Sequence, residues 1–219
     1  MALAIPSTIS LVLDWWVWEL MVLISGYLGV VEQASCILIM QICALSYQVA
    51  IGLEQASCTL IGRQIGKGDV PKAKQFYKTF QRITAAMVAT TSLLVYFFKE
   101  KIVSLFTGDQ SVQSTAASVI WIISFSNFPD GYKGMLKGVV RALGLQGKSV
   151  YINIVGHWCI NLTTQWLLGF HYGWGLTGMW LGKLLLEYFI FISYNIMIGC
   201  TDWDAVSQQS LARQAEDRR

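Results

Sequence analysis

Charged side chains are scarce in this sequence. Lysine, arginine, aspartate and glutamate make up 13% of the 219 residues, about half of the roughly 25% that is usual in soluble domains. So few charges cannot cover the surface of a soluble protein of this size. A disordered chain is excluded by the same count together with the 54% of hydrophobic residues, because disorder requires low hydrophobicity and high charge. The composition is that of an integral membrane protein.

Cysteines and recognisable catalytic motifs are also few. Five cysteines cannot supply the dense disulfide framework of a small secreted protein, and Cys36, Cys43 and Cys58 fall within apolar runs. We find no metal-ligand cluster, no Ser-His-Asp grouping and no complete nucleotide-binding loop. We therefore expect a protein that is not an enzyme, holds no cofactor or metal, and binds no nucleic acid.

Long apolar runs, by contrast, are abundant. Six of them can be marked along the chain, at residues 8–30, 34–56, 80–98, 111–128, 150–170 and 175–198. A bilayer span needs about 20 apolar residues, and lipid forces such runs into helices because unpaired backbone groups cannot be hydrated there. No repeat or Pro-rich linker divides them. The sequence predicts an all-α membrane protein, with one lobe of six transmembrane helices over residues 1–200 and a polar tail over residues 201–219.

Lysine and arginine gather in alternate connections between the predicted helices. The link over residues 62–79 carries five basic residues against one acid, Asp69, and the link after the fourth helix carries Arg141 and Lys148. The links after the first and fifth helices hold Glu32 and His171 and no Lys or Arg. Because basic connections stay in the cytoplasm, both termini and the tail are predicted to be cytoplasmic.

Two carboxylates lie within the first predicted span. At about 1.5 Å per residue, Asp14 falls about 9 Å along the helix beyond Thr8 and Glu19 falls about 16 Å beyond it, near the bilayer centre. Acids at that depth are expensive and are candidates for function by default. Desolvation favours the neutral acid, which gives a carboxyl group able to exchange a proton. The alternative is a boundary Asp14 and a structural Glu19.

Other side chains in the first two spans are candidates for a cavity lining. Trp18 lies deep enough to contact an aromatic or cationic compound. Gln41, Gln48 and Gln55 recur every seven residues and form one polar stripe along the second helix. This stripe must face protein or water instead of lipid, either as a pore lining or as hydrogen bonds between helices.

The fourth span combines a proline with a charged stripe. Pro129 removes one backbone hydrogen bond, and we expect it to interrupt the helix directly before Asp130. Asp130, Lys133, Lys137 and Arg141 follow at intervals of three and four residues, on one helix face. Asp130 is a candidate for binding or proton coupling, and Lys133 for the cavity lining. Lys137 and Arg141 fit a helix end that has left the membrane.

Several short motifs occur in one order along the chain. They are the acidic and aromatic segment Asp14–Glu19, the Gly-rich segment Arg63–Asp69, the segment Phe106–Asp109, the segment Gly138–Gln146, and the segment Gly178–Gly182. Each motif is weak alone, but together they are specific. Nearly the whole chain resembles the multidrug and toxic compound extrusion (MATE) family, specifically the C-terminal six-helix lobe of its eukaryotic members.

The resemblance implies roles for particular residues. In that family, acids on the seventh and tenth helices are linked to proton coupling and organic-cation recognition, and these roles carry over to Asp14, Glu19 and Asp130. Gln41 stands where some animal members have a further Glu. Family transporters resemble two six-helix lobes with a substrate cavity between them. The implied partners are therefore the lipid bilayer, an organic cation or xenobiotic, and a second lobe encoded upstream or on another chain.

Two functions remain open from the sequence. The first is efflux of organic cations or xenobiotics by secondary antiport across a plasma, vacuolar or vesicular membrane, with H⁺ as the coupling ion and Na⁺ as the alternative. The second is a structural membrane subunit or remnant that keeps the lobe fold without transport. Three intramembrane acids favour the first, because a scaffold has no need to bear their desolvation. The single lobe favours the second.

The predicted orientation can be tested by cysteine labelling in a variant that lacks the five native cysteines. A cysteine at Lys72, in the basic link, should react with an impermeant thiol reagent only after the membrane is opened. A cysteine at Tyr172, in a link without Lys or Arg, should react in intact cells if the protein lies in the plasma membrane. Labelling with the opposite sidedness would contradict the orientation.

Overall fold

The fold was analysed in a computed structural model, which describes the backbone of residues 4–216 and the side chains of residue 12 and residues 15–216. Nearly all of this described part is helical. The elements in chain order are α1 (Ala4–Ser25), α2 (Val30–Ile65), α3 (Val70–Phe97), α4 (Lys99–Phe106), α5 (Gln110–Ala142), α6 (Gln146–Ile154), the π-helix η1 (Val155–Asn161), α7 (Leu162–Trp166), the π-helix η2 (Leu167–His171), α8 (Gly175–Gly199) and α9 (Trp203–Glu216).

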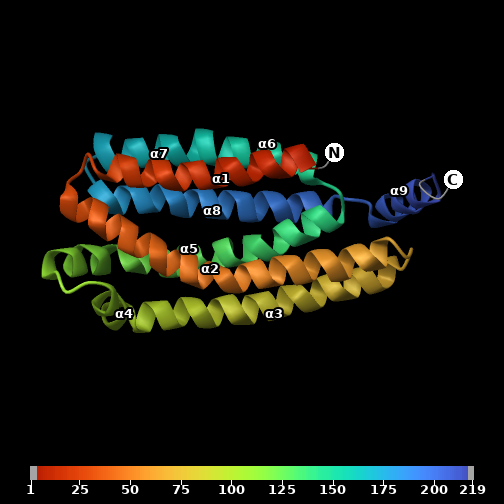
Figure 1. Ribbon diagram of the computed structural model, residues 1–219, viewed down its shortest axis with the longest axis horizontal. Coiled ribbons are helices and arrows are strands. Elements are labelled where there is room, and N and C mark those ends of the chain that lie inside the picture. Colours follow the sequence, from red (N-terminus) through yellow and green to blue (C-terminus); the bar gives the residue numbers. More distant parts are fainter. Residues whose placement is uncertain (1–3, 217–219) are drawn as a thin grey trace.

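Long rods run side by side along one axis (Figure 1). They are α1, α2, α3, α5, the continuous run from α6 to η2, and α8. Each rod overlaps one of the six apolar stretches marked in the sequence, which confirms the predicted all-helical architecture. Helices α2 and α5 continue well past the apolar stretches, to Ile65 and Ala142. These extensions are more polar, so hydropathy alone does not mark them.

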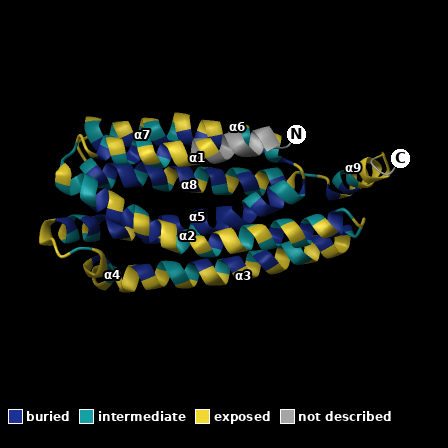
Figure 2. Ribbon diagram, viewed as in Figure 1, coloured by how far each residue is buried: buried dark blue, intermediate teal, exposed yellow. Residues whose placement is uncertain are grey.

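Helix α5 lies at the centre of the bundle and packs against α2, α3 and α8. Most of its residues between 119 and 140 are buried (Figure 2). The helix runs unbroken through the buried Pro129, so the expected interruption there is wrong. A proline removes only one backbone donor from a helix, and here neighbouring helices surround the affected turn.

Small residues let the neighbours of α5 and α8 approach closely. Gly134 and Gly138 of α5 face Ala50 and Glu54 of α2. A Cβ atom added at Gly134 would stand 2.8 Å from the Ala50 Cβ, and one added at Gly138 would collide with the Glu54 carbonyl. On α8, a Cβ at Gly182 would stand 2.9 Å from the Gln165 backbone nitrogen. These glycines therefore lie where helices pack closely.

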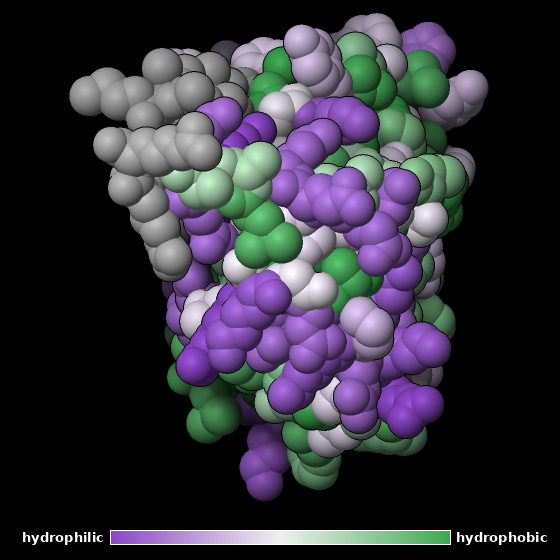
Figure 3. Space-filling view, turned by 90° about the vertical axis from the view of Figure 1, so that its right-hand side faces the viewer, coloured by the Kyte–Doolittle hydropathy of each residue, from purple (hydrophilic) through white to green (hydrophobic). Residues whose placement is uncertain are grey.

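The two basic connections counted in the sequence share one end of the bundle. The α2–α3 turn, the α5–α6 connection, the start of α1 and helix α9 all lie there (Figure 1). Figure 3 views this end and shows hydrophilic side chains gathered on it. The α2–α3 turn is specified locally: Gly68 adopts a φ of 81°, and the Asp69 carboxylate caps α3 by accepting a hydrogen bond of 3.1 Å from the Lys72 N–H.

The predicted tail carries a helix that docks on the bundle. In α9, the buried Trp203 lies against the Tyr77 ring of α3, with centroids 5.5 Å apart. The Ser207 hydroxyl donates a hydrogen bond of 2.8 Å to the Ile65 carbonyl at the end of α2. Helix α9 is therefore held at the hydrophilic end.

Several helices carry apolar side chains on their outer surfaces. Two described helices, α2 and α8, are long and apolar enough to cross a membrane, and the bent pair α3 and α4 would add a third if it forms one span. Large hydrophobic side chains stay exposed, among them Leu23, Leu45, Phe97 and Ile196, each at least 60% exposed. Exposed apolar surface on this scale fits contact with lipid or with another protein chain.

Replacement of Gly138 by alanine tests the close α2–α5 packing. We expect Gly138→Ala to lower the unfolding temperature in detergent, because the new methyl group must displace α2 backbone at a cost of about 1–3 kcal/mol. Gly52→Ala is the matched control, because a Cβ there meets nothing within 4 Å. That change should leave stability unchanged or raise it slightly, since alanine is the better helix former. Equal stability of the two variants would contradict the packing.

Candidate functional site

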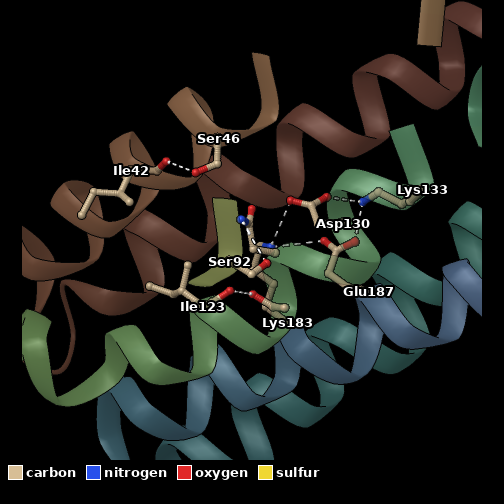
Figure 4. Close-up of polar contacts among 10 residues, drawn as sticks. Ile42, Ser46, Ser92, Ile123, Asp130, Lys133, Lys183 and Glu187 are labelled. Atoms are coloured by element: carbon tan, nitrogen blue, oxygen red, sulfur yellow. Dashed lines mark hydrogen bonds and ion pairs between the residues drawn. The ribbon is translucent and has the colours of Figure 1, made fainter. Parts of the chain in front are cut away.

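Four buried charged side chains meet between α5 and α8. Helix α5 supplies Asp130 and Lys133, and α8 supplies Lys183 and Glu187 (Figure 4). Each residue is at most 6% exposed. We refer to these four residues as the charge quartet.

The quartet alternates in sign. The Lys133 Nζ lies 2.5 Å from the Glu187 Oε2 and 3.0 Å from the Asp130 Oδ1. The Lys183 Nζ lies 3.3 Å from the Glu187 Oε1 and 3.8 Å from the Asp130 Oδ2. Each ammonium therefore faces both carboxylates, and the formal charge of the four groups sums to zero.

Helical spacing produces this arrangement. Asp130 and Lys133 are three residues apart on α5, and Lys183 and Glu187 are four apart on α8. Residues three or four apart share one face of a helix. Each helix thus presents one acid and one base to the other, and packing of α5 on α8 closes the quartet.

Aromatic rings surround one of the two lysines. The Lys183 Nζ stands 4.7 Å from the centroid of the Trp18 ring of α1, and 5.9 Å from that of Trp180. An ammonium within about 6 Å of an aromatic centroid is attracted by the ring quadrupole. Trp18 therefore links α1 to the quartet.

A small cavity of about 10 Å³ adjoins Lys183 and Glu187. Its lining combines α1, η1 and α8: Val17, Trp18, Met21, His157, Asn161, Lys183, Leu186 and Glu187. This volume is close to that of one water-sized sphere. His157 and Asn161 come from the π-helix η1, and π-helical turns are frequent at functional sites.

A larger cavity lies among other residues. It measures about 310 Å³ and is lined by Leu28, Glu32, Thr115, Ser118, Val119 and residues 173–177. It shares no lining residue with the quartet cavity. Of these two cavities, the smaller one adjoins the charge quartet.

The structure brings some of the candidate residues together and separates others. Asp130 and Lys133 are buried in the quartet, and Trp18 lies against it. Glu19, Gln41 and Gln48 are exposed on α1 and α2. The side chain of Asp14 lies outside the described residues.

Glu19 is exposed on the surface of this lobe. Val17 and Met21, two residues before and after it, are buried. A shift of two positions turns a side chain about 200° around a helix, so Glu19 points to the opposite side of α1. Any desolvation of its carboxyl group must come from lipid or from another protein surface.

Two quartet members, Lys183 and Glu187, were not among the candidates from the sequence. They lie inside the stretch 175–198, which reads as one apolar span. The sequence did contain a signal for these two residues, because two opposite charges four residues apart in a span are costly unless they are paired and buried. The partners across the interface, however, become visible only when α5 and α8 are packed.

The quartet should tolerate loss of one member poorly. Glu187→Gln leaves two ammonium groups against one carboxylate in a buried site, and breaking a buried pair costs about 3–5 kcal/mol. We expect a lowered unfolding temperature in detergent. Lys74→Ala is the control, because its 3.8 Å ion pair with Asp204 is exposed and worth at most about 1 kcal/mol.

A compensating change makes this test specific. Adding Lys133→Met to Glu187→Gln removes the excess positive charge and should recover much of the lost stability, since uncharged replacements of buried pairs are often neutral. The double variant contradicts this account if its loss of stability equals the sum of the losses measured for Glu187→Gln and Lys133→Met alone, because the two residues would then act independently.

Comparison with known sequences shows relatives among transporters. The profile of the family MatE matches residues 6–167. An uncharacterised transporter of Schizosaccharomyces pombe is 28% identical over 82% of this chain and 33% of its own length. The human multidrug and toxin extrusion protein 1 is 26% identical over 95% of this chain and 36% of its own length.

Solved structures share the fold of this chain. The crystal structure of a eukaryotic MATE transporter covers 97% of the chain with a TM-score of 0.92, at 23% identity, and the match takes up 48% of that transporter. A Vibrio cholerae MATE transporter, VcmN, covers 96% with a TM-score of 0.84, at 18% identity, and the match takes up 50% of it. The chain thus spans about a third of these curated relatives and half of these solved transporters. The chain belongs to the MATE family of multi-pass membrane transporters, and its fold is that of one lobe.

Proposed function

We propose that this chain is one lobe of a secondary transporter that exports organic cations or xenobiotics in exchange for protons, with Na⁺ as the alternative coupling ion. The human relative is named for multidrug and toxin extrusion. Family membership supports efflux transport in general. The coupling and the substrate class rest on the acids of the site.

The observation that carries the proposal is a set of polar side chains that this lobe leaves exposed. Glu19 on α1 and the stripe Gln41, Gln48 and Gln55 on α2 are all exposed. Carboxylate and amide groups facing hydrocarbon are costly, so these side chains need water or protein against them. A second six-helix lobe, across a water-filled cavity, would supply both.

Competition for one carboxylate provides the proposed mechanism. In the cavity between two lobes, Glu19 would be reached by protons and by cationic substrates alike. Binding of a cation favours the ionised carboxylate, and binding of a proton makes it neutral and releases the cation. A proton gradient then drives export, because the carboxylate binds a proton on the side with the higher proton concentration and a cation on the other side.

The charge quartet supports a second candidate function. Asp130 and Glu187 are already matched by two lysines, so their burial is explained without a substrate. This pairing favours a structural membrane subunit that keeps the lobe fold without transport. The two functions differ in whether the exposed carboxylate, Glu19, is needed for efflux.

Substitutions in a complete transporter that contains this lobe separate the two candidates. Glu19→Gln mimics the permanently protonated acid and should reduce proton-driven efflux of an organic cation at least about tenfold at equal expression. Asp130→Asn removes one negative charge from the quartet and should weaken substrate affinity while some coupling remains. The measurement is transport of the organic cation by membrane vesicles that contain the transporter, with and without a pH gradient.

Glu100→Gln is the matched control, because Glu100 is an exposed acid on the short helix α4. It should leave efflux unchanged. If Glu19→Gln keeps full pH-dependent efflux, Glu19 is not the coupling group. If the transporter containing the unaltered lobe moves no organic cation, the structural subunit becomes the better account.

A further inference from the structure

The ammonium group of Lys183 occupies the kind of site that receives organic cations. The Trp18 ring lies 4.7 Å from its Nζ, and the carboxylates of Glu187 and Asp130 lie 3.3 Å and 3.8 Å away. An aromatic face with nearby carboxylates is the usual chemistry for holding a free alkylammonium ion. Here the cation is attached to the protein by a flexible four-carbon stem.

The two lysines of the quartet hold different positions. Lys133 makes the shorter contacts, at 2.5 Å and 3.0 Å, whereas both contacts of Lys183 are longer than 3.2 Å. The lining of the small cavity includes Lys183 but not Lys133. Lys183 is therefore the more loosely paired cation, and it adjoins space between α1, η1 and α8.

We propose that Trp18, Asp130 and Glu187 form a cation cage in which the Lys183 ammonium is a tethered occupant. The ligand class of the cage is a small primary alkylammonium ion, which uses the same ring and carboxylates when the Lys183 ammonium is absent. The described structure is the self-occupied state of this cage.

Charge balance determines how a free cation enters. The quartet sums to zero while the Lys183 ammonium is in place, so an additional cation would leave a buried net charge of one. Such an uncompensated charge is strongly unfavourable. A free cation must therefore replace the Lys183 ammonium, which makes Lys183 a competitor of cationic ligands. The relevance of this competition to export rests on the proposed function; the cage itself does not.

Chemical rescue of Lys183→Ala tests the cage in the 219-residue chain, purified in detergent. Ethylammonium carries the same ammonium group as lysine and two of the three side-chain carbon atoms that the substitution removes. The variant should unfold at a lower temperature than the unaltered chain. Ethylammonium chloride at 100 mM, assuming a dissociation constant of about 10 mM, should raise that temperature by about 3 °C or more, and NaCl at equal ionic strength should not.

Three further variants make the rescue specific. Lys183→Met fills the vacated space without a charge and should gain nothing from ethylammonium. Lys133→Ala removes the lysine that does not line the cavity, and its gain should be at most half as large because the Trp18 ring lies over the Lys183 ammonium. Adding Trp18→Leu to Lys183→Ala should reduce the gain by at least half, because the aromatic face is lost.

If Lys183→Ala yields only aggregated protein, the readout is the monodisperse fraction after solubilisation with or without ethylammonium. A larger monodisperse fraction with ethylammonium than with NaCl supports the cage. The cage is wrong if ethylammonium gives no gain, if Na⁺ gives an equal gain, or if Lys133→Ala is rescued to the same extent. Because no transport is measured, these results are independent of the efflux test on Glu19.

Discussion

Pairing of four buried charges is the constraint on which the rest of this lobe depends. An unpaired ion in a buried site costs several kcal/mol, so α5 and α8 can pack only where each carboxylate faces both ammonium groups. A slip of one helical turn, about 5.4 Å, would separate the two pairs that cross between the helices, Lys133–Glu187 and Lys183–Asp130. The charge quartet therefore fixes the register of the two helices, and the contact between Lys183 and Trp18 extends this constraint to α1.

The contacts of α5 with α2 and α3 are set by the absence of side chains. Gly131 faces Val88 of α3, while Gly134 and Gly138 face Ala50 and the Glu54 carbonyl of α2. Backbones that approach this closely compensate for the weak driving force between apolar helices in lipid. At the hydrophilic end, the ion pair of Arg141 with Glu54 joins α5 and α2 again. Helix α5 is thus positioned by charge against α8 and by close packing against α2 and α3.

The hydropathy pattern predicted the long helices of the lobe, because a segment in lipid has few alternatives to a helix. It could not predict where α2 and α5 end, since polar helical turns outside the membrane look like connections. The site was predicted only in part. Asp130 and Lys133 stand out on one helix, but Lys183 and Glu187 pair with residues of α5 that lie more than 50 positions away along the chain. Glu19 shows the converse: its depth could be counted, but the face it occupies depends on which neighbours bury Val17 and Met21.

The polar groups of the lobe are of two kinds, buried and exposed, and each kind is stabilised in a different way. The quartet is internal and its formal charges sum to zero, so each charge is offset by its neighbours inside the bundle. Glu19, Gln41 and Gln48 are on the surface of the lobe, and hydrocarbon cannot satisfy them. Buried charge is therefore balanced within the lobe, whereas the exposed polar groups need water or a protein surface against them.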